Sequence, residues 1–198
     1  MSADQVQAAS VEEVVAELAQ ECALQAGSYV ATVHEIASGE NAAAAIPMGL
    51  LALSQVLVMG ARLGAIEDVV PSEQFESDRG PDVDLEPLLL ALRDQFEGLD
   101  DYTDVIDPVT STEVAAGSLS SDLVEITACL MHGLQHHEAG AHSEALWWWQ
   151  FSYLSQWGVR AAMALRVLQT LLGHVRLDAD DEEVLEAQFD ALHPPPSS

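Results

Sequence analysis

The chain has 198 residues, of which 33 are acidic and six are basic, so its formal net charge is -27. All six basic residues are arginines, and the lack of lysine excludes a phosphate-loop lysine, a pyridoxal phosphate Schiff base and a kinase-type lysine. The charge also argues against direct binding to nucleic acid or to an anionic membrane, because both carry phosphate. We therefore expect a soluble, cytoplasmic protein whose protein partner presents a basic surface.

Composition and periodicity predict one all-α domain. With 49% hydrophobic and 20% charged residues, the chain can bury a sizeable core. Cys22 and Cys129 are the only cysteines and lie far apart, which indicates no disulfide framework. Because no alternating apolar pattern is longer than a few residues, we predict a single bundle of about five to six helices over 10–177.

The first predicted helix follows a disordered start over 1–9. Ser10 and Glu13 have the spacing of a capping box, in which each side chain bonds the other residue's backbone amide. The apolar stripe behind them has helical spacing and consists of Val11, Val15, Leu18, Cys22, Tyr29, Val33 and Ile36. Cys22 is thus expected to be a core residue.

The segment 46–66 is apolar on nearly every side. A membrane span needs about twenty clean apolar residues, and this run contains Pro47, Gln55 and Arg62 and has acidic flanks. We therefore expect a buried central helix and no membrane insertion.

The middle of the chain is acidic: 67–117 holds 15 of the 33 carboxylates. Its prolines predict an acidic loop over 67–86, with a helix through Leu88 and Phe96 and an ordered turn over 98–108. The acidic runs "DRGPDVDLE" and "LDADDEEVLE" lack the full spacing of a calcium loop, so calcium binding is not expected.

Two helices are predicted next, over 118–138 and 143–175. The second contains all four tryptophans, and Glu144 is its only acid, which indicates a long central helix around which the others pack. The remainder, 178–198, reads as a short acidic helix and a proline-rich tail.

A helical wheel of 143–175 divides the tryptophans between faces. Trp157 and Leu154 lie on the inner face, which also holds Leu146, Tyr153, Ala161, Ala164, Leu165, Leu168, Leu171 and Leu172. Trp147 lies at its edge and Trp149 on a flank, whereas Trp148 points among polar residues that include Ser152. Either another segment covers Trp148, or Trp148 anchors a partner.

Two other residues of this helix need a structural explanation. Gln150 falls on the inner face, where a buried amide needs hydrogen-bond partners; Tyr102, Asp122 or His137 could supply them. Gly158 is too central to be a simple helix cap, so we expect it to permit a close helix approach or a kink.

The stretch "ALWWWQFSYLSQWG" resembles the signature of an uncharacterised bacterial family, domain of unknown function 5063 (DUF5063). The resemblance rests on Trp147, Trp149, Phe151, Trp157 and Gly158, and further matches are "SLSSDLVEI" and "DDYTDVIDP". It extends from the first helix to about His174 and implies an all-helical domain without assigning an activity. The family often has histidine where this chain has Gln156, which weighs against shared imidazole chemistry there.

Five polar residues follow one flank of the predicted helix over 118–138. Asp122, Glu125, Cys129, His132 and His136 are spaced by three and four residues. Cys129, His132 and His136 are of the types that bind zinc or another divalent transition metal. The alternative is a solvated polar flank without a metal.

No sequence motif supports an enzyme. The chain lacks a Gly-x-Ser-x-Gly elbow, a glycine-rich phosphate loop and a His-Glu-x-x-His helix. The first hypothesis is a non-enzymatic protein-interaction or regulatory module. The alternatives are a metalloprotein and a nucleic-acid mimic that occupies a basic protein groove, and the broad apolar faces also allow homo-oligomers.

Overall fold

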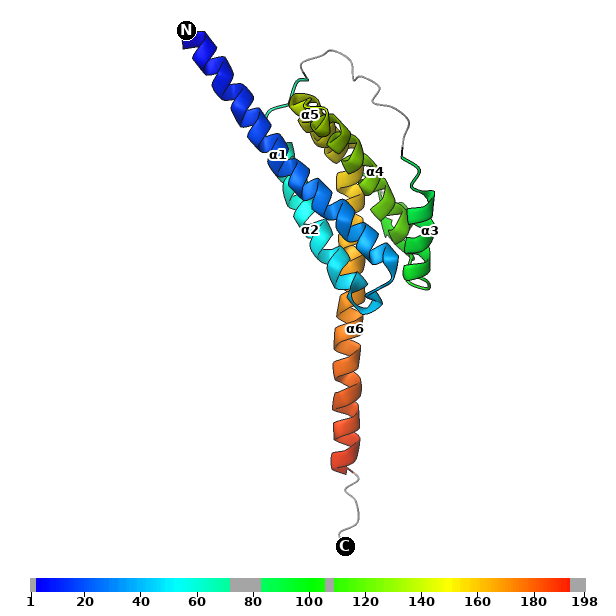
Figure 1. Ribbon diagram of the computed structural model, residues 1–198. Helices are drawn as coiled ribbons and strands as arrows, with labels where there is room; N and C mark the ends of the chain where they lie inside the picture. The colour runs from blue at the N-terminus through cyan, green and yellow to red at the C-terminus, as the bar shows by residue number, and fades with distance from the viewer. Residues whose placement is uncertain (1–2, 72–82, 106–108, 193–198) are drawn as a thin grey trace.

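The computed structural model describes residues 3–71, 83–105 and 109–192 and confirms the predicted all-α bundle (Figure 1). Its α-helices are α1 (Ala3–Ser38), α2 (Ala45–Gly64), α3 (Glu86–Gln95), α4 (Leu119–Glu138), α5 (His142–Ser152) and α6 (Gly158–Leu192). A short 3-10 helix, Ala42–Ala44, precedes α2, and a π-helix, Tyr153–Trp157, joins α5 to α6. The central helix predicted over 143–175 is thus continuous but contains one π turn.

Helix α1 is longer than the sequence predicts. It begins at Ala3, so the disorder expected over 1–9 is wrong for the described residues 3–9, and Ser10 lies within the helix instead of capping it. The segment contains neither glycine nor proline and is rich in alanine and glutamine, which favour helix extension. Its stripe is buried as predicted at Cys22, Tyr29, Val33 and Ile36.

Helix α2 runs antiparallel to α1 and is buried on one face only. That face contains Gly49, Ala52, Leu53, Val56, Met59, Gly60 and Leu63, at helical spacing. The opposite face exposes Leu51 and Val58, each at 63%, which corrects the expectation of a fully buried central helix. The segment Ala42–Gly64 is long and apolar enough to cross a membrane, a test that core helices also pass, and a third of its apolar window is buried.

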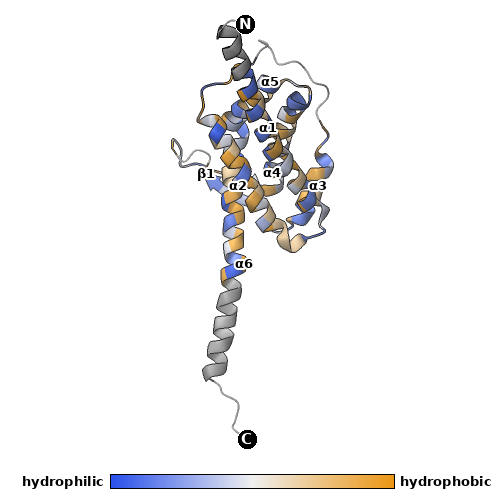
Figure 2. Cartoon of the chain, turned by 60° about the vertical axis from the view of Figure 1, so that its left-hand side comes forward, coloured by the Kyte–Doolittle hydropathy of each residue, from blue (hydrophilic) through white to orange (hydrophobic). Residues whose placement is uncertain are grey.

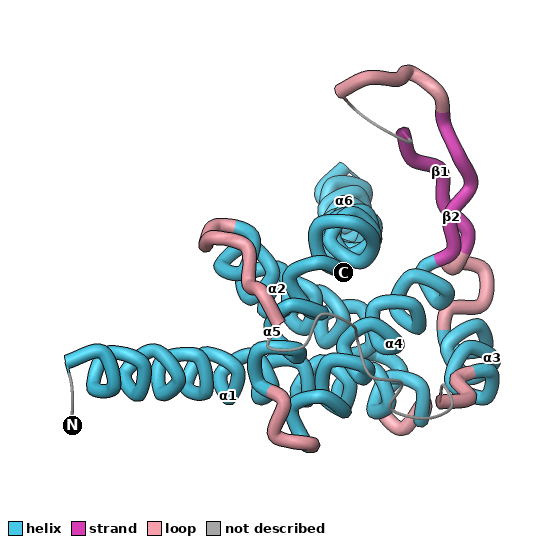
Figure 3. The backbone as a smooth tube through the Cα atoms, turned by 90° about the horizontal axis from the view of Figure 1, so that it is seen from above, coloured by secondary structure: helices cyan, strands magenta, loops and turns pink. Residues whose placement is uncertain are grey.

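A small hairpin replaces the turn predicted over 98–108. Strand β1 (Asp101–Val105) pairs antiparallel with β2 (Val114–Ser118), with Asp101 opposite Ser118. Seen from above, the hairpin lies beside α6, on the side away from the N-terminal half of α1 (Figure 3). The hairpin was not predictable from the sequence pattern because β2, Val-Ala-Ala-Gly-Ser, has no apolar alternation.

The end of the chain also differs from the prediction. Helix α6 continues to Leu192 and extends beyond the bundle, without the break expected near 178 (Figure 1). The part of α6 within the bundle carries many hydrophobic residues (Figure 2). The segment 178–192 has no glycine or proline to end the helix. The tail over 193–198 and the part of the acidic loop over 72–82 lie outside the described residues.

The π turn changes which residues face the core. A uniform wheel places Leu154 inside and Ser152 outside, yet Leu154 is 60% exposed and Ser152 is fully buried. A π turn inserts one residue, so residues five apart come to share a face. The indole Nε1 of Trp157 accordingly donates a hydrogen bond to the hydroxyl of Ser152 at 3.1 Å.

Candidate functional site

Two tryptophans of the signature belong to the core. Trp149 is fully buried, and its Nε1 donates to the carbonyl of Leu130 at 3.1 Å. Its ring lies so close to Gly133 that a Cβ there would be 2.1 Å from Nε1. Trp157 is also fully buried and packs against Gly60 of α2. These residues join α5 and α6 to α4 and α2.

Gly158 is part of the π turn. Its N–H donates to the carbonyl of Tyr153, five residues earlier, and a Cβ on Gly158 would lie 2.4 Å from that oxygen. The Tyr153 ring occupies the same space, at 2.8 Å. A glycine at this position therefore allows the Tyr153 ring and the π hydrogen bond to coexist.

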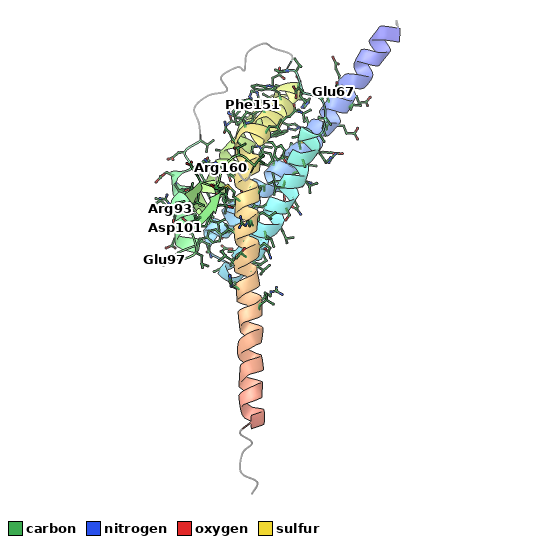
Figure 4. The ribbon with its side chains drawn as sticks, turned by 180° about the vertical axis from the view of Figure 1, so that it is seen from behind. Glu67, Arg93, Glu97, Asp101, Phe151 and Arg160 are labelled. Atoms are coloured by element: carbon green, nitrogen blue, oxygen red, sulfur yellow. The ribbon has the colours of Figure 1, made fainter. Side chains whose placement is uncertain are left out.

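Trp147 and Phe151 form an aromatic pair near the surface. Their rings are nearly parallel, with centroids 5.6 Å apart and an interplanar angle of 10°. Trp147 is half-buried, whereas Phe151 is 47% exposed and lies at the upper end of the bundle in Figure 4. The signature thus includes residues that do not belong to the closed core.

Trp148 is partly covered by α4. Its Nε1 donates to the carbonyl of Cys129 at 2.8 Å, and its ring centroid lies 4.2 Å from that of His132. The side chain is partly buried and packs against the core. Its indole N–H is therefore engaged within the chain, which leaves less of the residue for anchoring a partner.

Gln150 is buried, but its partners are not those that we expected. Its Nε2 donates to the carbonyls of Leu63 and Glu67, at 2.8 and 3.3 Å, and its Oε1 accepts from the N–H of Val69 at 2.8 Å. Tyr102 and Asp122, two of the expected partners, are bonded to each other. Gln150 thus fixes the chain where it leaves α2.

A polar network joins the hairpin to α4 and α6. Asp122 is almost completely buried, accepts a hydrogen bond from the hydroxyl of Tyr102 and pairs with Arg160 at 3.0 Å. Arg160 also pairs with Glu125 at 2.6 Å. Burial raises the pKa of Asp122, and the hydrogen bonds from Tyr102 and Arg160 oppose this effect. Burial, followed by the bond to Asp122, also raises the pKa of Tyr102.

The same two sequence segments meet a second time at Asp100. Its Oδ2 accepts from the hydroxyls of Ser118 and Ser120 at 2.8 Å, and its Oδ1 accepts from the N–H of Ser120 at 2.7 Å. The hydrogen bonds of Asp100 and Asp122 thus join the segments "DDYTDV" and "SLSSDL", two of the stretches that carry the family resemblance. Because these bonds link the hairpin to α4, they fix the hairpin in place.

The structure places the three predicted metal ligands at different depths along α4. Cys129 and His136 are buried, whereas His132 is half-buried beside Trp148. Within the described part of the chain, no three His, Cys, Asp or Glu side chains are grouped so as to hold a metal ion. Burial, with a smaller contribution from Glu125, raises the pKa of the Cys129 thiol to about 11, which disfavours a thiolate ligand.

This flank of α4 is only partly the solvated surface that was the alternative, because Glu125 is exposed and His132 is half-buried, whereas the other three side chains are not exposed. The side chains of Asp122, Cys129 and His136 are buried. Helices α5 and α6 both pack against α4, and Asp122 is bonded to Tyr102 of the hairpin and to Arg160 of α6. A cleft of about 380 Å³ remains there, lined in part by His132, Trp148 and Gln156. The Cys129 thiol points to the Oε1 of Gln156 at 3.5 Å.

A second cleft, which we call the outer groove, lies between α1 and α2. It measures about 390 Å³ and is lined by Glu21, Leu24, Gln25, Ser54, Gln55, Val58, Met59 and Arg62. Leu24 and Val58 are each 63% exposed, and the Glu21–Arg62 ion pair, 2.8 Å long, crosses from one helix to the other. The groove therefore combines aliphatic side chains with polar ends. Sequence reasoning missed it because Leu24 and Val58 resemble core residues.

Several arginines that the structure describes form ion pairs with carboxylates of the same chain. Arg62 pairs with Glu21, Arg160 with Asp122 and Glu125, and Arg166 with Asp104 at 2.8 Å. Each of these arginines therefore offsets a carboxylate of the same chain. Because acidic residues greatly outnumber arginines, the rest of the surface carries a net negative charge.

Comparisons with known proteins support the fold without assigning an activity. The sequence model of one family, described as Domain of unknown function (DUF5063), matches residues 13–174. The crystal structure of protein BF1032 from Bacteroides fragilis is similar, with a TM-score of 0.57 and 18% sequence identity over 76% of this chain and 89% of that one. At this identity the likeness shows the fold alone. No curated protein matches the chain.

Proposed function

The chain belongs to the DUF5063 family, and we propose that it is a non-enzymatic interaction module that binds a basic partner protein in the cytoplasm. The observation that carries this proposal is the surface of α1 and α2. Leu24, Leu51 and Val58 are each 63% exposed there, on a chain whose net charge is -27. Exposed aliphatic side chains in an acidic surround are typical of a contact with a cationic, amphipathic partner.

Two further observations support a binding role over a catalytic one. The buried carboxylate that most resembles a catalytic group, Asp122, has both oxygens engaged by Tyr102 and Arg160. The cysteine of the α4 flank has a raised pKa, the opposite of an activated nucleophile. These residues are better explained as the framework that holds the helices in place.

The proposal predicts a partner whose retention falls as salt rises. The chain, immobilised, is exposed to extract of the cells that produce it, at about 50 mM and about 500 mM sodium chloride, and retained proteins are identified by mass spectrometry. We expect a basic protein that is retained at low salt and released at high salt, because screening weakens attraction between opposite charges.

Two triple variants with equal charge changes test whether the carboxylates attract the partner. Glu12→Gln/Glu13→Gln/Glu17→Gln neutralises exposed acids of α1, and Glu97→Gln/Asp101→Asn/Glu113→Gln neutralises exposed acids near α3 and the hairpin. Weaker retention by either triple variant supports an electrostatic partner. The proposed function would be overturned if the same proteins were retained at both salt concentrations and by both triple variants.

A further inference from the structure

The outer groove has the geometry to receive a helix. Leu51 and Val58 lie on the same outer face of α2, seven residues apart, which corresponds to about 10 Å along the helix axis. Leu24 faces the groove from α1. A helix laid along α2 would present side chains at positions i and i+7 over Leu51 and Val58, and at i+3 or i+4 toward the groove between them.

The acids of this face lie mainly at one end. The antiparallel arrangement places the C-terminal end of α2, followed by Glu67 and Asp68, near the N-terminal half of α1 (Figure 4). That half of α1 carries the exposed Glu12, Glu13 and Glu17. The single cation that lines the groove, among the residues described, is Arg62, which is paired with Glu21. The charge of this end therefore complements basic side chains.

We infer that the outer groove binds an amphipathic helix of a basic partner, with apolar residues against Leu24, Leu51 and Val58 and with lysines or arginines toward Glu13, Glu17 and Glu67. The inference rests on the proposed function and adds the place of contact and the form of the partner. A lipid surface would also accept exposed aliphatic side chains, but the carboxylates beside them repel anionic headgroups.

A synthetic peptide tests the inference directly. The probe is a peptide of about 18 residues with leucines at helical spacing and lysines elsewhere, and its control has the same composition in an order that breaks the apolar stripe. Binding to the full chain is measured by fluorescence anisotropy. We expect saturable binding of the amphipathic peptide and weaker binding of the scrambled one.

Two double variants locate the contact. Leu24→Gln/Val58→Gln changes the groove, whereas Leu90→Gln/Val159→Gln changes side chains of similar exposure, 55% and 57%, on α3 and α6. All four side chains are exposed, so circular dichroism is expected to show the same helix content and the same melting temperature in both variants. Affinity for the amphipathic peptide is expected to fall about tenfold or more in the groove variant alone.

The other outcomes each overturn the inference. Equal affinity of the two variants, or of the two peptides, would mean that charge alone attracts the peptide. The proposed function would survive that result, because its own test is the salt-sensitive capture of a partner. Self-association that the groove variant abolishes would assign the groove to a second copy of the chain. Binding to zwitterionic phosphatidylcholine vesicles that the groove variant abolishes would assign it to lipid.

Discussion

Two clefts of this bundle differ in how far their side chains are engaged by the rest of the chain. In the cleft between α4 and α5, the indole of Trp148 is bonded to Cys129, and the Cys129 thiol points to Gln156. In the outer groove between α1 and α2, Leu24 and Val58 are mostly exposed. In the cleft between α4 and α5, tryptophan and cysteine side chains link the helices, whereas in the outer groove aliphatic side chains stay uncovered. In this chain the tryptophans and cysteine therefore contribute to packing, whereas ordinary aliphatic residues form the surface at which we propose a contact.

We call the buried side chains that join α4 and α5 to their neighbours the closed region. The largest expected effect is in this region, at Gly133 of α4. Gly133→Ala would place a Cβ 2.1 Å from the indole nitrogen of Trp149, so the ring must move and its bond to Leu130 is lost. We expect a loss of about 3 kcal/mol in the free energy of unfolding, measured by urea denaturation.

The matched control is Gly173→Ala, also within a helix but with no atom within 4 Å of the added Cβ. This substitution should stabilise the protein by up to about 1 kcal/mol, since alanine favours the helical state. Equal effects of the two substitutions would show that the Trp149 contact is not tightly packed.

A smaller loss is expected at Gln150, which also belongs to the closed region. Gln150→Leu leaves the N–H of Val69 and the carbonyl of Leu63 without this partner, and we expect a cost of about 2 kcal/mol in urea denaturation. Hydrogen exchange at Val69 should become faster. Gln25→Leu, in the outer groove, is the control, and an equal loss there would remove the contrast between the regions.

The sequence allowed prediction where burial follows local periodicity. Cys22, Tyr29, Val33 and Ile36 of α1 were expected at the core from their spacing, and all four are buried. Such stripes are visible because each helix turns the same side chains inward at a constant interval. The family membership was likewise readable, since its signature lies within one short stretch.

Three features could not be read in this way. The π turn changes the interval inside one helix, so Leu154 and Ser152 exchange their expected places. Gln150 finds its partners 81 to 87 residues away, at backbone groups that carry no side-chain signal. The outer groove was missed because exposure of an aliphatic residue depends on which helices fail to cover it. Gly158, expected from the sequence to permit a close helix approach or a kink, was the available hint of the π turn.

A pH measurement sharpens the comparison within the closed region. The pKa of Asp122 is raised in the fold, chiefly by burial, so the folded protein holds this proton more tightly than the unfolded chain. The contribution of Asp122 to stability is therefore present below its unfolded pKa, about 3.9, and declines as pH rises through its folded pKa. The melting temperature of the wild type minus that of Asp122→Asn should fall as pH rises from about 4 to about 7. A difference that grows with pH would contradict the raised pKa.

The smallest expected effect lies in the outer groove, at the ion pair between Arg62 and Glu21. Both side chains are more than half exposed, at 60% and 51%, so solvent screens their attraction. Arg62→Gln should therefore change the free energy of unfolding by less than about 1 kcal/mol. The same substitution removes the cation that lines the groove, so the affinity for a basic amphipathic peptide should rise slightly at low salt and not at high salt. A large loss of stability would instead place this pair among the contacts that hold α1 to α2, and the groove would then be a structural seam and not an open surface.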